Sequence, residues 1–326
     1  MRRHATRLFF AIGPDGLLTA VAIVSLGAVA GVLGGKFQLG LDGLAPLVML
    51  GVLLALTAVV RLPLLLDRRP GDRRRFFEQQ VLAARSWAPF FLVYVSYRAL
   101  RGTMDYVIRG GVEWKLKALD EALLGVSPSW WMEKIASPWL TELMTYGYSL
   151  MFVLPLLVLV LLYARERMAG FREVALAVLA AFYLGLVLYL IVPAKSPRLV
   201  YEYATKLHGA LGFYEISELA WDRLNRVTYD AFPSLHTCIS SIALVYAWRH
   251  GAALSRRRPR LLFWIYLPHV AVLQMSTLYL RQHYFVDLIG GWALAGFVLW
   301  LAPRMVRGWE ALRARALVLG GAGQAA

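Results

Sequence analysis

Long apolar stretches alternate with short polar stretches along almost the whole chain. A helix needs roughly 20 apolar residues to cross a bilayer, and eight stretches come close to that length or exceed it. Backbone groups cannot stay unpaired in lipid, so the pattern predicts an all-α, polytopic transmembrane bundle. The candidate spans are 17–35, 44–66, 81–100, 139–163, 174–193, 234–250, 261–280 and 284–302.

We expect a single membrane domain over residues 1–326, with three parts. These are a two-span extension (1–80), a six-helix core (81–303) and a basic cytoplasmic tail (304–326). The tripeptide 28–30, Ala-Val-Ala, is similar to a signal-peptidase site. The apolar run continues past it, however, which favours an uncleaved helix.

Two of the polar stretches are expected to add structure on the outer side. In residues 105–138, an apolar stripe of Trp114, Leu116, Leu119 and Leu123 predicts an amphipathic helix in the membrane interface. This helix either anchors the protein or covers a site. Residues 199–230 form a polar, aromatic loop that is long enough for a lid or a recognition element.

The composition also predicts a membrane protein, with 59% hydrophobic residues and a mean hydropathy of +0.57. The net charge of +15 first suggests nucleic acid, but the basic residues gather in alternate connections and at both ends, which is the positive-inside pattern. We therefore expect no nucleic-acid partner, a cell (inner) membrane location, cytoplasmic termini and anionic lipid at the cytoplasmic loops. Cys238 is the single cysteine, which excludes an internal disulfide and a cysteine-based metal cluster.

Chemistry enters the apolar pattern at residues 279–287, Tyr-Leu-Arg-Gln-His-Tyr-Phe-Val-Asp. A helix that starts near Gln282 places His283 and Asp287 on one face, four residues apart. The carboxylate then fixes the imidazole tautomer and leaves the other nitrogen free as a base, nucleophile or ligand. The alternative is a structural pair that only satisfies hydrogen bonds.

Two further polar segments lie at span ends on the same, outer side. Lys195 and Arg198 follow the fifth span and either hold a phosphate or anchor to head groups. Ser234 is expected at the cap of the sixth span, with His236 in its first turn, where helix amides suit an anion. Arg98, Arg101 and Tyr279 are additional candidates for substrate contacts, although an arginine at a span end also snorkels to head groups.

Two histidines, one acid and three cations (Lys195, Arg198, Arg281) at one membrane depth are the parts for phosphate-ester chemistry. No cluster of carboxylates indicates a two-metal site, so we expect no metal and no cofactor. The cations would then neutralise the phosphate themselves. A lipid carrier or flippase is the alternative from another class, but it predicts ionisable groups near the middle of spans rather than at their ends.

The motifs resemble those of the type 2 phosphatidic acid phosphatase superfamily, which includes vanadium haloperoxidases and sphingolipid synthases. Its Pro-Ser-Gly-His motif is similar to residues 233–236, Pro-Ser-Leu-His, and its third motif pairs a His with an Asp as His283 and Asp287 do. Ser276 also matches, whereas Thr277 stands where an Arg is expected, and Lys195 with Arg198 matches the first motif only loosely. The resemblance covers roughly residues 90–302.

Within the superfamily, the sequence looks most like inositol phosphorylceramide synthases and their bacterial relatives. The resemblance implies a metal-independent lipid head-group phosphotransferase in which His283 attacks phosphorus, Asp287 orients it, and His236 serves as acid and base. Lys195, Arg198, Arg281 and Ser234 would hold the phosphate oxygens. A head group such as phosphoinositol would move to a lipid or polyol hydroxyl at the outer leaflet. The alternative is a lipid phosphatase acting on phosphatidic acid or a prenyl (di)phosphate.

Overall fold

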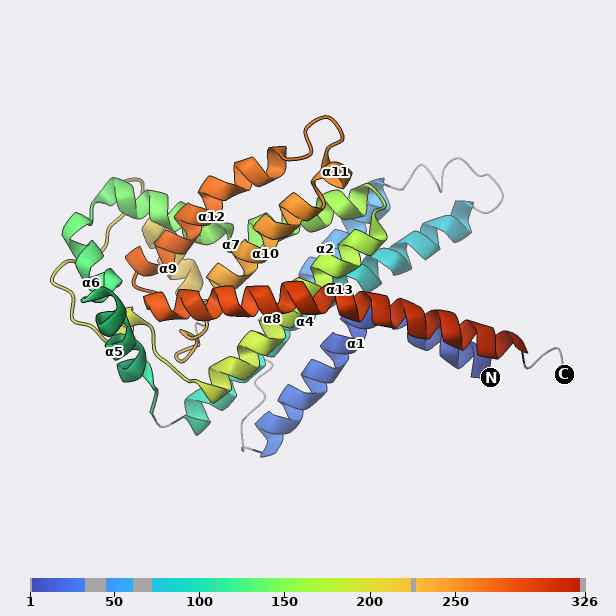
Figure 1. The fold of residues 1–326 in the computed structure, drawn as a ribbon, viewed down its shortest axis with the longest axis horizontal. Coiled ribbons are helices and arrows are strands. Elements are labelled where there is room, and N and C mark those ends of the chain that lie inside the picture. The colour runs from blue at the N-terminus through green and yellow to red at the C-terminus, as the bar shows by residue number, and fades with distance from the viewer. Residues whose placement is uncertain (1, 33–44, 61–71, 109, 224–226, 323–326) are drawn as a thin grey trace. The chain divides into compact units, whose positions relative to one another are not determined.

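The computed structural model describes residues 2–32, 45–60, 72–108, 110–223 and 227–322, and these contain helices and no strand (Figure 1). The expectation of an all-α fold is therefore confirmed. The helices are α1 Arg2–Val32, α2 Ala45–Val60, α4 Asp72–Val107, α5 Glu113–Leu124, α6 Pro128–Met132, η2 Glu133–Ile135, α7 Pro138–Ala164, α8 Met168–Ile191, η3 Pro197–Leu199, α9 Phe213–Arg223, α10 Leu235–Arg249, α11 Gly251–Leu254, α12 Leu261–Tyr279 and α13 Phe285–Ala322.

Five of the helices in the described ranges are long and apolar enough to cross a membrane. They are α1 from Ile12, α7, α8, α12 and α13 to Ala316. The other three expected spans correspond to α2 and α10, which have 16 and 15 residues, and α4, whose apolar run contains Arg85. The expectation of eight spans with both termini cytoplasmic stays a prediction.

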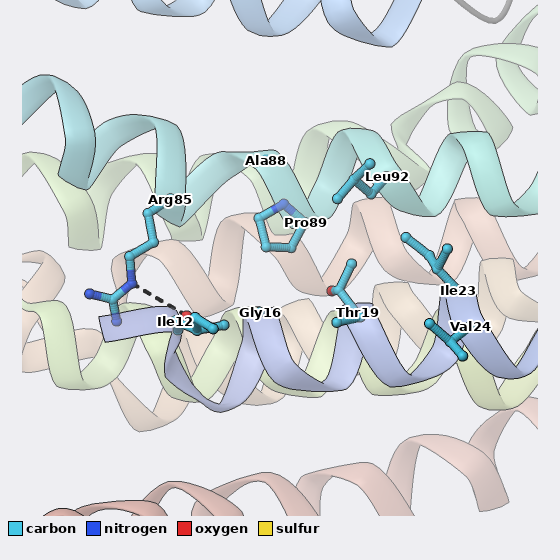
Figure 2. Close-up of a pocket in the computed structure, with 10 residues that line it drawn as sticks. Ile12, Gly16, Thr19, Ile23, Val24, Arg85, Ala88, Pro89 and Leu92 are labelled. Atoms are coloured by element: carbon cyan, nitrogen blue, oxygen red, sulfur yellow. Dashed lines mark hydrogen bonds between the residues drawn. The ribbon is translucent and has the colours of Figure 1, made fainter. Parts of the chain in front are cut away.

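The chain forms two compact units, residues 1–103 with 308–326 and residues 104–307. In the first unit, α1 breaks at Gly13, whose φ of 80° is readily adopted only by glycine. The break leaves the Ile12 carbonyl to accept a hydrogen bond from Arg85 Nε at 3.3 Å. Beyond this contact, α1 and α4 line an apolar groove of about 580 Å³, with Thr19 and Pro89 on its two walls (Figure 2).

In the second unit, α10 lies at the centre and contacts α7, α8 and α12. Both α7 and α10 begin at a serine cap: Ser137 accepts from the Leu140 amide, and Ser234 accepts from the Thr237 amide at 3.3 Å. These caps satisfy amides that lack a partner within the helix. The sequence-based expectation for the start of the sixth span is confirmed.

Helix α5 differs from the expected amphipathic stripe in one residue. Trp114, Leu119 and Leu123 are exposed as expected of an interface helix, but Leu116 is buried with Asp120 on the opposite side. The spacing of four residues explains why Leu116 and Asp120 share a face. The helix therefore presents one apolar surface outward and a second, smaller surface to the protein.

Two segments are more helical than expected. Helix α13 continues through Pro303 to Ala322, so residues 304–322 of the expected basic tail are helical. Helix α9 occupies part of 199–230, which we expected to be a loop.

Gly291 of α13 marks the closest approach of α13 to α10. A Cβ at this position would lie 2.5 Å from the Ser234 carbonyl oxygen and 3.0 Å from Thr237 Cβ. We expect Gly291→Ala to destabilise the protein by about 1–3 kcal/mol, because backbone has to move. Thermal unfolding of the purified protein in detergent measures this change.

Gly296 is the matched control, since it lies on the same helix with no atom within 4 Å of its Cβ position. Gly296→Ala is expected to be neutral or stabilising, because alanine favours helix by up to about 1 kcal/mol over glycine. Equal unfolding temperatures for the two variants would contradict the close approach at Gly291.

Candidate active site

His283 and Asp287 lie side by side in the interior of the second unit. His283 Nδ1 is 3.3 Å from Asp287 Oδ2, and the aspartate is completely buried. The nearer partner of Nδ1 is the Ala231 carbonyl oxygen, at 2.8 Å. Because both partners are acceptors, we assign the proton to Nδ1, which leaves Nε2 with a free lone pair.

The helix start expected near Gln282 is wrong. Helix α12 ends at Tyr279, Arg281 takes a left-handed φ of 62°, and the amides of Gln282 and His283 both donate to the Thr277 carbonyl. Helix α13 begins only at Phe285. His283 therefore precedes the helix, and it reaches Asp287 from a turn whose Tyr284 amide donates to Asp287 Oδ2 at 2.8 Å.

His236, in the first turn of α10, faces His283. Their ring centroids are 5.7 Å apart, with planes inclined by 59°. On another side, His236 stacks on Tyr148 of α7, with centroids 4.0 Å apart and planes inclined by 25°. Trp221 of α9 meets the edge of Tyr148 at 4.7 Å, so two aromatic rings hold His236 in place.

Backbone hydrogen bonds join the three segments that the sequence left unconnected. The Arg198 amide donates to the Arg281 carbonyl at 2.9 Å, and the Ser234 amide donates to the Asp287 carbonyl at 2.9 Å. The Ala231 amide donates to the Ala194 carbonyl at 3.1 Å. The structure thus brings together the polypeptide around Lys195, Ser234 and His283.

Two of the three candidate cations are paired with glutamates. Arg281 lies 3.6 Å from Glu133 and stacks over the Tyr203 ring at 3.7 Å, and Arg198 lies 3.3 Å from Glu218. Nη2 of the buried Arg281 makes no hydrogen bond within the described part of the chain. The same nitrogen is the atom that lies 3.6 Å from Glu133 Oε1, so it is ion-paired but keeps hydrogen-bonding capacity that a phosphate oxygen could use.

Lys195 and Ser234 make different contacts. Lys195 Nζ lies 5.5 Å from the centre of the Tyr229 ring, while the Lys195 amide is 3.5 Å from Glu113 Oε2. Ser234 Oγ accepts from both the amide and the hydroxyl of Thr237. The hydrogen of the Ser234 hydroxyl is left to donate elsewhere.

Tyr203 also borders Arg281. Burial raises the pKa of Tyr203 to about 12, and its hydroxyl donates to Ser129 Oγ at 2.9 Å. The ring therefore stays neutral at physiological pH and serves Arg281 as an aromatic face.

The remaining sequence candidates have other surroundings. The Tyr279 hydroxyl contacts the Thr141 hydroxyl at 2.9 Å and the backbone of Ser137, so a substrate contact there stays a prediction. The side chains of Arg98 and Arg101 lie outside the part of the structure that is described. Within the described ranges, no group of three or more His, Cys, Asp or Glu is placed to hold a metal ion.

Sequence reasoning missed five contributors: Tyr148, Ala231, Asp120 and the two glutamate partners of the arginines. Asp120 accepts the amides of Phe285 at Oδ2 and Val286 at Oδ1, both at 2.9 Å. Burial raises the pKa of Asp120, against the effect of these two hydrogen bonds. The spacing of Asp120 from Leu116 was a usable signal; nothing in the sequence singled out Tyr148 or the Ala231 carbonyl.

A family model described as the PAP2 superfamily matches residues 115–301, more than half of the chain. The chain belongs to the PAP2 superfamily. This PAP2 protein is therefore an integral membrane enzyme of the lipid phosphatase and phosphotransferase type, which confirms the resemblance at the superfamily level. No curated protein and no solved structure matches the chain.

The ring of Tyr148 provides the next prediction. Tyr148→Ala removes the stacking partner of His236, and aromatic pairs contribute about 0.5–1.5 kcal/mol, which corresponds to a loss of rate of about 2–10-fold. Tyr148→Phe keeps the ring and should stay within about twofold of wild type. Initial rates of lipid turnover at equal amounts of folded protein measure both. Equal losses for Phe and Ala would contradict a stacking role.

Proposed function

We propose that this PAP2 protein transfers a phosphoryl-linked head group, such as phosphoinositol, from a phospholipid to a lipid or polyol hydroxyl through a phosphohistidine at His283. The observation that carries the proposal is the pair of imidazoles 5.7 Å apart, one of them bonded to a buried carboxylate. A single phosphoryl group between the rings can contact both. The outer-leaflet site and the absence of a metal requirement are parts of the proposal.

In the first step, Nε2 of His283 forms a bond to phosphorus while the bond from phosphorus to the lipid oxygen breaks. Protonated His236 donates its proton to that leaving oxygen. In the second step, neutral His236 takes the proton from the acceptor hydroxyl, whose oxygen attacks phosphorus as the P–N bond breaks. His283 returns to its initial state, and His236 is again protonated.

The cations and Ser234 would stabilise the charge on the phosphate oxygens. Arg281 offers Nη2, which is ion-paired with Glu133 but makes no hydrogen bond, and Ser234 offers a hydroxyl hydrogen at the start of α10. Amides at a helix start add a positive field that suits an anion. Lys195 and Arg198 lie on the segment hydrogen-bonded to both histidine-bearing regions, and they complete the positive charge.

The glutamates favour a phosphodiester over a phosphomonoester. A monoester carries about −1.5 to −2 charges at neutral pH, whereas a diester carries one. Glu133 and Glu218 each offset part of an arginine's charge, so a second negative charge on the substrate is disfavoured. A phospholipid with a hydroxylated head group presents one charge and several donors for these carboxylates. This observation supports head-group transfer over hydrolysis of phosphatidic acid.

The phosphohistidine predicts the outcome of labelling with phosphatidylinositol tritiated in the inositol ring. Wild-type protein quenched during turnover should carry tritium in an acid-labile bond, because the head group moves with the phosphorus. His283→Ala should lose both this label and turnover, by at least about 10³-fold, because the nucleophile is gone. Glu121→Gln, an exposed change on α5, is the control and should behave as wild type.

Thin-layer analysis of the same reaction separates transfer from hydrolysis. A new tritiated lipid, or a tritiated product made with an added polyol, supports transfer. Release of free phosphate from phosphatidic acid, with no tritiated product from phosphatidylinositol, would show a lipid phosphatase instead. Undiminished turnover by His283→Ala would overturn the phosphohistidine for either reaction.

Neutralising Glu218 should shift the substrate preference. Glu218→Gln removes a negative charge beside Arg198, and partly exposed pairs contribute about 0.2–1 kcal/mol. We expect the ratio of kcat/KM for phosphatidic acid to that for phosphatidylinositol to rise about 2–5-fold. Glu121→Gln removes an equal charge from α5 and should leave the ratio unchanged. A ratio that stays constant or falls in Glu218→Gln would contradict the charge argument.

A further inference from the structure

We propose that Asp120 is a positioning residue for the reaction at His283, acting through the backbone that carries the imidazole. The inference rests on the proposed function, because it gives Asp120 a part in chemistry at that histidine. Its carboxylate is completely buried, and each oxygen accepts one amide of α13, from Val286 at Oδ1 and from Phe285 at Oδ2.

Asp120 and Asp287 together accept hydrogen bonds from three consecutive backbone amides. Tyr284 donates to Asp287, and the next two amides donate to Asp120. These are amides at the start of a helix, which have no acceptor within the helix itself. The turn between His283 and α13 thus has its direction set by two carboxylates.

Asp120 belongs to a helix far along the chain from the amides that it accepts. A local Ser, Thr or Asp at the helix start satisfies such amides at low cost. Here the acceptor comes from α5, 165 residues before Phe285, and it requires burial of a carboxylate, which is costly. What the distant acceptor adds is a fixed distance between α5 and the His283 turn.

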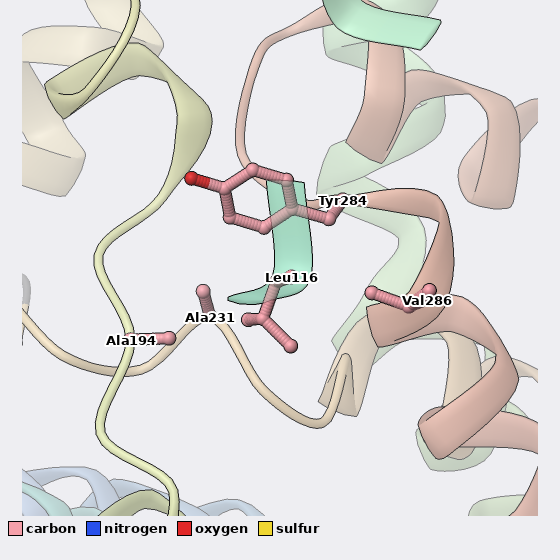
Figure 3. Close-up of a cluster of buried hydrophobic side chains, with 5 residues drawn as sticks. All are labelled: Leu116, Ala194, Ala231, Tyr284 and Val286. Atoms are coloured by element: carbon pink, nitrogen blue, oxygen red, sulfur yellow. The ribbon is translucent and has the colours of Figure 1, made fainter. Parts of the chain in front are cut away.

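Helix α5 is itself held against the other side of the site. Leu116, one turn before Asp120, lies among Ala194, Ala231, Tyr284 and Val286 (Figure 3). Just before α5, the Val112 amide donates to the Pro193 carbonyl at 2.8 Å. Ala231 supplies the carbonyl nearest to His283 Nδ1. Asp120 and Leu116 therefore connect the turn of His283 with the segments that hold its imidazole and lead to Lys195.

The test compares Asp120→Asn and Asp120→Ala with Glu121→Gln, the exposed neighbour on α5. Asparagine keeps the shape but offers one acceptor oxygen and turns an NH₂ group toward the other amide. We expect Asp120→Asn to lower kcat about 10–100-fold, because misplacement of a reacting group by about 1 Å costs about 100-fold. KM should stay within about twofold, since Arg198, Arg281 and Ser234 are unchanged. The substrate is whichever of phosphatidylinositol and phosphatidic acid the wild type consumes.

Rates are divided by the folded fraction from thermal unfolding in the same detergent, and single-turnover labelling of His283 is measured alongside. Slower labelling of folded Asp120→Asn supports positioning. Wild-type kcat per folded molecule, or a loss that follows the folded fraction alone, overturns it. Asparagine could still accept one of the two amides, so Asp120→Ala is measured as well. We expect Asp120→Ala to lower kcat more than Asp120→Asn does. The variant His283→Ala tests the nucleophile separately. If His283→Ala is inactive while the Asp120 variants keep wild-type kcat, the proposed function stands and only the role of Asp120 is overturned.

Discussion

The hydrogen bond from His283 Nδ1 to the Ala231 carbonyl is the contact on which the rest of the site depends. It joins the α12–α13 turn to the segment before α10, and Ala231 is bonded in turn to Ala194 beside Lys195. The Asp287 carboxylate accepts from the same imidazole nitrogen at a longer distance. A backbone carbonyl cannot ionise, so it holds the proton of the neutral ring on Nδ1 whether or not Asp287 is ionised. The carboxylate adds what a carbonyl lacks, namely a negative charge that stabilises positive charge on the ring.

Two of the candidate cations, Arg198 and Arg281, are paired with acids of their own. Backbone, aromatic rings and a buried acid hold both histidines, so in the proposed function the positive charge for the substrate comes from the longer side chains of the cations. Arg281 and Arg198 meet Glu133 and Glu218, which belong to η2 and α9. Those elements lie within residues 105–138 and 199–230, the two stretches for which the sequence offered a covering or recognition role. Their carboxylates reduce the net positive charge of the two arginines, so the proposed function assigns specificity and nucleophilicity to different residues.

The sequence was sufficient for the parts of the fold that follow from local pattern. Hydropathy located the helices because burial of apolar length in lipid is a property of the segment itself. Pro233 and Ser234 placed the start of α10 because capping is a local interaction. The start of α13 was misplaced, since its amides are capped by Asp120 from a distant helix and its preceding turn depends on the left-handed Arg281. Long-range acceptors of this kind leave no periodic signal, and neither does the stacking of Tyr148 on His236.

Leu235 and Thr277, the two departures from the superfamily motifs, are both buried in the structure. Leu235 is buried against α8, where a Cβ on Gly185 would lie 2.6 Å from its Cδ2, so glycine at position 185 leaves room for the leucine side chain. The Thr277 hydroxyl donates back to the Gln274 carbonyl within α12, and only its backbone carbonyl serves the His283 turn. In the proposed function, the choice between a hydroxyl and water as the acceptor rests instead on the two glutamate–arginine pairs and their effect on the charge of the substrate.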